Sequence, residues 1–281
     1  MGLSGLLRWA RGRFGISLLL ALSASGGRSG AEALDAAKII QGFLETAKAS
    51  AEREAAQELI YVRRSVFEHL NGDGTVEERR SKEHWVTNSA GSVRAELIRV
   101  NDREPTAGEI LSDQKHESEG RRKLSRRSRG PDFLDARLLS RFDYTWEAVE
   151  ELAGREVYRL AFEPVQTNPD SNNSTGSDNR DVNRVIGLLH GHLWIDIETF
   201  ELVRMECSLR SPFRLLGGLV GSLSRLDLVV DRRPVAAGCW SNVNVLTHIE
   251  GRKLISPLRI RASIEQEGFK LRPIDSSPAT H

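Results

Sequence analysis

Alternation of apolar and polar residues in the second half of the chain constrains the fold more than any other feature. Residues 192–197 alternate, and residues 203–210 alternate again after a turn at Glu198 and Thr199. Successive side chains of a strand point to opposite faces, so this pattern predicts a hairpin with one dry face. The residues expected on that face are Leu193, Ile195, Ile197, Val203, Met205, Cys207 and Leu209.

Further strands are predicted along the rest of the chain, joined by short turns and with no regular strand–helix alternation. The segments concerned are 59–67, 75–86, 93–97, 143–162, 226–230, 243–247 and 258–264. This organisation predicts a mostly β protein with some α structure, built on one antiparallel sheet of roughly eight to eleven strands that has to curve. The Ala-rich segment 31–58 has apolar residues every three or four positions, which predicts an amphipathic helix covering the sheet.

The first 26 residues have the order of a secretory signal peptide. Arg8, Arg11 and Arg13 precede an apolar run at 14–22, and small residues follow. A bilayer span needs roughly 20 apolar residues, so the run is too short for an anchor. We therefore expect an exported protein with a cleaved signal and peripheral rather than integral membrane contact; a cytosolic amphipathic start is the alternative.

Residues 31–273 are expected to form a single domain with two polar excursions. The first, at 106–130, is charged and helical, and its run Arg121–Arg129 has six basic residues in nine without an aromatic residue among them. Without stacking residues we interpret this run as a solvated helix or loop rather than a phosphate or nucleic-acid site. The second, at 166–183, is rich in Asn, Asp, Ser and Gly and is predicted to be disordered.

The motifs of catalysis and cofactor binding are absent from the sequence. The net charge is only +1, which gives no global argument for nucleic-acid binding. His190 and His192 could share one strand face, but with no third ligand identifiable we interpret them as hairpin-edge histidines rather than a metal site. The carboxylates between Asp143 and Glu151 are interpreted as a solvated edge. We expect no enzyme, no cofactor and no metal.

Cys207 and Cys239 are the two cysteines of the chain. An exported protein could oxidise such a pair to a disulfide. Two separately buried thiols are the alternative, because sequence spacing says nothing about the distance between the Cα atoms.

Three segments resemble the LolA/LolB-like superfamily of bacterial envelope proteins, together with the order of helix, hairpin, strands, helical excursion and β tail. They are 101–105 (NDREP), 154–160 (GREVYRL) and 191–196 (GHLWID). The resemblance covers about residues 32–270. It implies a half-barrel of antiparallel strands with helices on its concave face, and an apolar cavity that holds an acyl chain of a lipid or lipoprotein.

Function and location follow as implications of this resemblance. The chain would be a non-catalytic periplasmic binding protein in outer-membrane lipid or lipoprotein trafficking or sensing. The alternative is an envelope protein-interaction or scaffold module with no lipid ligand, docking a protein partner through the run Arg121–Arg129.

The segment that follows the predicted hairpin is apolar and rich in glycine. A lipid-binding sheet needs a flexible apolar lid, whereas an ordinary loop is polar, so we predict that this segment is the lid. The predicted lipid-binding residues are Phe213, Leu215, Leu216, Leu219 and Val220. A buried helix on the sheet is the alternative, although Gly217, Gly218 and Gly221 would each cost it about 1 kcal/mol.

Overall fold

The computed structural model describes residues 30–89, 92–126, 139–165, 183–215, 221–236, 238–254 and 256–273. The predicted signal peptide lies outside these ranges. So do residues 127–130 of the charged excursion and residues 166–182 of the polar loop.

The described residues include two helices and eleven strands. The helices are α1 (Gly30–Ala55) and α2 (Ala107–Arg126). The strands are β1 (Gln57–Leu70), β2 (Val76–Ser89), β3 (Ser92–Val100), β4 (Phe142–Leu152), β5 (Arg155–Pro164), β6 (Leu189–Asp196), β7 (Leu202–Leu209), β8 (Phe213–Leu215), β9 (Gly221–Ala236), β10 (Cys239–Lys253) and β11 (Ser256–Pro273). The helical part of the charged excursion is thereby confirmed as α2.

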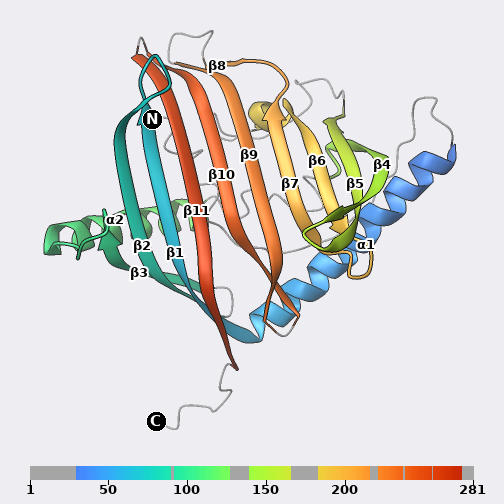
Figure 1. The fold of residues 1–281 in the computed structure, drawn as a ribbon, viewed down its shortest axis with the longest axis horizontal. Helices are drawn as coiled ribbons and strands as arrows, with labels where there is room; N and C mark the ends of the chain where they lie inside the picture. The colour runs from blue at the N-terminus through green and yellow to red at the C-terminus, as the bar shows by residue number, and fades with distance from the viewer. Residues whose placement is uncertain are drawn as a thin grey trace.

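All strands belong to one antiparallel sheet with the order β3-β2-β1-β11-β10-β9-β7-β6-β5-β4, and the short β8 pairs with β9 beside this path. The two edge strands, β3 and β4, do not pair with each other, so the sheet stays open as a curved half-barrel (Figure 1). The predicted class, a curved antiparallel sheet covered by helices on its concave face, is confirmed.

Both helices lie on the same face of the sheet, which we call the inner face. Ile264 of β11 packs in one cluster with α1. The strand register sets Ser65 opposite Ile264 and Lys82 opposite Ser65, so Lys82 points from the same face, and it contacts α2 through Asp113. In Figure 1, α1 crosses the half that contains β4–β7, and α2 lies behind β1–β3.

Helix α1 ends three residues earlier than the pattern predicts, because the residues from Gln57 onward belong to strand β1. Gln57 pairs with Pro273, and Glu58 pairs with both Arg272 and Ser89. Two ladders of backbone hydrogen bonds outweigh the small helix propensity of a few residues.

The predicted hairpin exists as β6 and β7, but its second face is not polar. Trp194 is buried there beside Val157, Val203 and Trp240. The assignment of Val203 to the dry face with Met205 is wrong, because a β-bulge lies between the pair Trp194–Arg204 and the pair Ile195–Leu202. The extra residue turns Val203 to the outer face and leaves Leu202 with the inner core.

Candidate functional site

A mostly apolar strip runs along the middle of the inner face, with Thr247 of β10 as the polar residue opposite Ala262. Val245 and Ile249 of β10 stand opposite Ile264 and Ile260 of β11, and Ala262 lies between the last two. All five side chains are buried. Because residues paired in register share a face, the strip is one surface rather than a set of separate contacts.

Helix α1 covers one end of this strip. Its apolar side, with Ile40 and Phe43, packs in the same cluster as Val245 and Ile264. The approach is close at Gly42, where an added Cβ would lie 2.6 Å from Cδ1 of Phe200. The absence of a side chain at Gly42 therefore lets α1 approach the turn between β6 and β7.

Phe213, the first residue of the predicted lid, covers the other end. Phe213 is buried in a cluster with Ile249 and Ile260 of the strip. The guanidinium of Arg184 lies 5.0 Å from the centre of its ring. Phe213–Leu215 form the three-residue strand β8 rather than irregular chain, while Leu216, Leu219 and Val220 lie outside the described residues.

A group of polar side chains occupies the inner face on β1 and β2, next to the strip. We call it the polar corner: Arg63, Ser65, Lys82, His84 and Asp113. Arg63, Ser65 and His84 are 6%, 0% and 1% exposed. The inner face thus changes from apolar on β9–β11 to polar and basic on β1 and β2.

Asp113 ties α2 to this corner. Its carboxylate accepts hydrogen bonds from Lys82 Nζ at 2.6 Å and pairs with His84 Nε2 at 2.9 Å. Burial by itself would raise the pKa of Asp113, but the bonds from His84 and Lys82 outweigh it and hold the pKa well below its usual range. The ionised form of Asp113 is therefore the one that holds α2 on the sheet.

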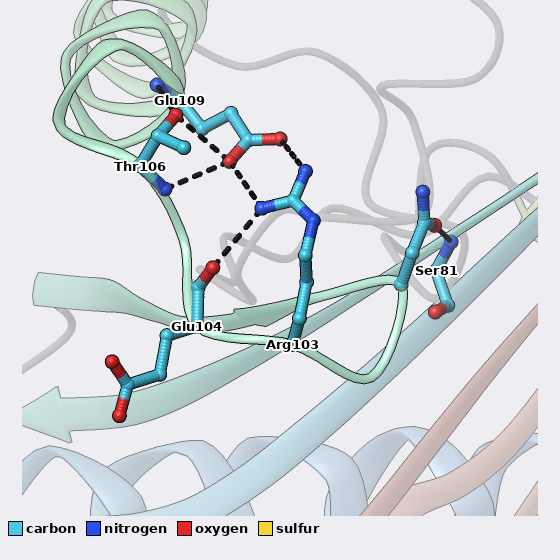
Figure 2. A network of polar contacts seen from close by, with 6 residues as sticks. Ser81, Arg103, Glu104, Thr106 and Glu109 are labelled. Carbon is cyan, nitrogen blue, oxygen red and sulfur yellow. Dashed lines mark hydrogen bonds and ion pairs between the residues drawn. The ribbon is translucent and has the colours of Figure 1, made fainter.

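The turn into α2 fixes where that helix begins (Figure 2). Asn101 and Asp102 both have positive φ, and backbone bonds between Val100 and Arg103 close the turn on either side. Asn101 Oδ1 accepts the N–H of Ser81 at 2.8 Å, which ties the turn to β2. This geometry explains why Asn and Asp, which tolerate the left-handed region, stand at the exit of β3.

The first turn of α2 is capped by side chains shown in Figure 2. The N–H of Thr106 donates to Glu109 Oε2 at 2.8 Å, and the N–H of Glu109 donates back to Thr106 Oγ1 at 3.3 Å, which is a capping box. Arg103 donates two hydrogen bonds to the Glu109 carboxylate, at 2.7 and 2.9 Å. Those bonds and the Thr106 bonds lower the pKa of Glu109 to about 2.

A second polar cluster joins the end of α1 to the sheet. Ser50 Oγ donates to Glu201 at 2.5 Å, and Arg232 pairs with the other oxygen of Glu201 at 3.3 Å. Arg53 donates to Ser50 Oγ at 2.8 Å. Burial raises the pKa of Glu54 nearby, with the charge of Arg232 opposing that shift. We interpret this cluster as the anchor of α1 rather than a reactive centre.

The outer face has an aromatic and arginine layer that the sequence does not predict. The guanidinium carbons of Arg159 and Arg204 lie 5.7 and 5.9 Å from the centre of the Trp194 ring. The indole N–H of Trp194 donates to Glu150, and Arg159 pairs with Glu147 at 2.9 Å. Glu147 and Glu150 of the predicted solvated edge take part in this ion-pair network, and both lie on the edge strand β4 with side chains 36% and 37% exposed, which agrees with that interpretation.

Asp196 is also buried on the outer face, although the alternation predicts a solvent-exposed polar residue at this position. Its carboxylate accepts a hydrogen bond from Arg155 at 2.9 Å and two from Thr199, at 2.8 Å each. Burial alone would raise its pKa, but these bonds lower it. Asp196 therefore shapes the turn between β6 and β7.

His190 and His192 lie on β6, which pairs with β5 and β7 and is thus an interior strand, so the description as edge residues is wrong. His192 Nε2 lies 3.4 Å from Glu147. Within the described residues, no three His, Cys, Asp or Glu side chains are grouped so that they could hold a metal ion.

Cys207 and Cys239 are both free and buried, so the structure shows two separate thiols rather than a disulfide. Cys207 belongs to the inner core, and burial raises the pKa of its thiol to about 12. Cys239 donates to Gln57 Oε1 at 3.2 Å.

The chain is similar to several solved structures over 85% of its length. One is a putative outer membrane lipoprotein-sorting protein domain from Vibrio parahaemolyticus, at 10% identity and TM-score 0.30, with 95% of that chain covered. Another is a LolA superfamily protein from Nitrosomonas europaea, at 10% identity and TM-score 0.31, with 94% covered. A third is a DUF1329 family protein from Desulfovibrio piger, at 11% identity and TM-score 0.28, with 95% covered.

The sequence resemblance to LolA-like proteins is thus matched among solved structures, at distant similarity. No family model matches the chain, and no curated protein matches it in sequence. Because the identities and TM-scores are low, we argue the function from the residues of this chain alone.

No helix among the described residues has the length and apolar character needed to cross a membrane.

Proposed function

We propose that this chain binds an acyl chain of a lipid or lipoprotein on the inner face of its sheet, with Phe213–Val220 as the lid. The observation that carries the proposal is the position of Phe213. It packs on Ile249 and Ile260, so moving the lid would bare one end of the apolar strip. An acyl chain could then replace the apolar contacts that the lid gives up.

The strength of the attachments favours movement at the lid rather than elsewhere. Strand β8 has three residues and pairs with β9, whereas β10 and β11 have 15 and 18 residues and each pairs with a long strand on both sides. Local opening takes place where few hydrogen bonds and apolar contacts have to break. The long strands then stay in place as a fixed surface for the ligand.

The cellular setting is part of the same proposal. The basic, apolar and small-residue order of residues 1–26 supports export with a cleaved signal, and a bacterial periplasm would then be the place of action. There the chain would act in trafficking or sensing of envelope lipids or lipoproteins, as a binding protein and not as an enzyme.

Uptake of a fluorescent acyl probe by the purified protein tests the proposal. We expect saturable uptake by the wild type and a severalfold tighter affinity for Phe213→Ser, because in this variant the acyl chain no longer has to displace the apolar contact between Phe213 and the strip. Leu246→Ser is the matched control. Leu246 follows Val245 on β10 but is 43% exposed on the outer face, so its replacement should leave uptake unchanged. Absence of uptake by the folded wild type would contradict the proposal.

Docking of an envelope protein partner is the second candidate function, and one observation favours it. Leu111 is 66% exposed on α2, and the C-terminal part of this helix contains the first six residues of the basic run Arg121–Arg129. A basic helix with an exposed leucine is suited to an acidic partner surface with an apolar centre. Reversing the charges at Arg121 and Arg122 should then abolish partner capture and leave acyl uptake alone.

A further inference from the structure

We infer that the end of the sheet next to the lid docks on the surface of an anionic lipid bilayer. The residues concerned are Leu254, in the turn between β10 and β11, with Lys253 before it and Arg214 on β8. This inference goes beyond the proposed acyl binding, because it names the surface with which the protein would exchange a ligand. It does not depend on that binding, since a protein could dock in this way without taking up an acyl chain.

The turn between β10 and β11 has an unusual residue for its geometry. Lys253 pairs with Ser256, so only two residues connect these long strands. Such turns favour Asn and Gly, because the turn types that fit the twist of the strands need positive φ. Leu254 has a φ of 55° and is 57% exposed. Neither its backbone conformation nor its exposure stabilises the fold, so both point to a role at the surface.

The surroundings of this turn are basic. Residues 251–264 and 209–226 contain no Asp or Glu. Lys253 and Arg214 are exposed, and neither makes an ion pair with any other residue that the structure describes. Anionic lipids attract such cations, and an apolar side chain at the same place can enter the boundary between headgroups and acyl chains. A leucine beside free cations therefore suits a bilayer surface.

The size of the basic region favours a bilayer over a protein partner. Arg259 of β11 donates to the carbonyl of Asn71 at 2.8 Å, which holds the turn between β1 and β2 beside it, and that neighbourhood has the exposed acidic residues Asp73 and Glu77. The positive charge thus ends at β11. A hairpin tip is small and convex, whereas a stable protein interface buries about 1,200–2,000 Å². Reversible contact with a bilayer needs only a few basic and apolar side chains.

The lid lies at the same end of the sheet. Leu215, the last residue of β8, pairs with Gly221 of β9, and Gly221 pairs with Lys253 of β10. In Figure 1, β8 and this end of β10 and β11 lie together at the top. Phe213 covers the nearby end of the apolar strip. Docking would place this end against the lipid, so an acyl chain could reach the strip with little exposure to water.

Flotation of the purified protein with lipid vesicles tests the docking. We expect about tenfold tighter binding to vesicles that contain phosphatidylglycerol than to vesicles of phosphatidylcholine alone. Leu254→Asn should weaken binding to both kinds of vesicle severalfold. Because Asn tolerates positive φ, this variant should unfold at the same or a higher urea concentration, so its weaker binding would not be due to unfolding. Lys253→Gln should reduce only the preference for the anionic vesicles.

Two control variants make the same chemical changes elsewhere on the sheet. Leu246→Asn removes an exposed leucine from the outer face of β10. Lys270→Gln removes an exposed lysine from the other end of β11, where Lys270 pairs with Ile60. Both variants should bind vesicles as the wild type does.

The outcomes separate docking from acyl binding. Docking is overturned if the wild type binds no vesicles, if Leu254→Asn binds them as well as the wild type, or if the two lipid compositions bind equally. It is also overturned if the turn captures a protein and no vesicles. Uptake of the fluorescent acyl probe without vesicles should be unchanged in Leu254→Asn, because Leu254 lies outside the strip. Vesicle binding without any probe uptake would support docking and contradict acyl binding.

Discussion

Phe200 lies against Gly42 of α1. Phe200 has a φ of 55° and lies with its ring centre 6.3 Å from that of Tyr158, so its position is set from two sides. The ring occupies the space where a side chain of residue 42 would stand. A glycine within a helix usually weakens it, but here it permits contact with the sheet.

Replacement of Gly42 by alanine should therefore destabilise the protein. Alanine favours a helix by about 1 kcal/mol over glycine, but forcing a methyl group into an occupied space costs typically 1–3 kcal/mol. The midpoint of urea unfolding measures the balance. Gly108→Ala is the control, because a Cβ at Gly108 of α2 would meet no atom within 4 Å. A gain in stability for Gly42→Ala equal to that of the control would contradict this account.

The polar corner could not be predicted from single residues of the sequence. Arg63 and Ser65 have the same alternation as any exposed strand positions, and their burial depends on strands and helices brought in from elsewhere. The lid was easier to identify, since an apolar and glycine-rich segment between strands is unusual. Phe213, its first residue, does lie on the inner face, and the remaining lid residues stay a prediction.

In residues 107–116 of α2, whose side chains the structure describes, polar contacts join the helix to the sheet. Asp113 bonds to two side chains of β2, and the capping box with Arg103 fixes the first turn. Leu111 next to this anchor points away and is mostly exposed. An element attached in this way can leave the sheet without disturbing the apolar core.

Replacement of Asp113 by asparagine should detach α2 while the sheet stays folded. A hydrogen bond to a charged group contributes about 1.5–3 kcal/mol, and most of that would be lost for Lys82. Hydrogen exchange should show faster exchange of α2 amides and unchanged protection of β1 and β2. Asp102→Asn makes the same change of charge at an exposed turn residue and should have no such effect. Loss of protection throughout the sheet would show instead that Asp113 supports the whole fold.

Most elements could be predicted from the sequence, because their signals are local. Alternation, turn residues and the spacing on α1 are all read within about twenty positions. Within β7 the prediction placed Val203 instead of Leu202 on the inner face, since the bulge adds one residue there and leaves no mark in the sequence. Met205 and Cys207 were assigned to the correct face. Strand order was not predicted either: that β7 pairs with β9 depends on contacts between distant segments.

Acid should destabilise the whole molecule. The pKa values of Asp113, Asp196 and Asp227 are all lowered: burial opposes the shift in each case, and bonds from neighbouring donors outweigh it. A carboxyl group with a lowered pKa in the folded state stabilises it above the ordinary value of about 3.9, and the contribution disappears as the pH falls below that value. Glu54, whose pKa is raised, acts in the opposite sense and offsets a part.

Urea unfolding at a series of pH values measures this dependence. The midpoint should change little near neutral pH and fall steeply below about pH 4. Asp196→Asn should flatten the acid limb by removing one of the three groups. A midpoint that rises on acidification would mean that buried groups such as Glu54 dominate instead.

The pairing of β1 with β11 affects how the chain folds during its synthesis. Gln57 and Pro273 are partners, so the first and last strands meet in the middle of the sheet and not at its edges. A chain that emerges from a ribosome or a translocation pore N-terminus first offers β1 with an unpaired side until its last segment arrives. Because β1 and β11 pair late, folding is slow, and the unpaired edge of β1 can form hydrogen bonds with neighbouring chains and cause aggregation. A chaperone that shields residues 57–70 during synthesis would give this sheet time to close.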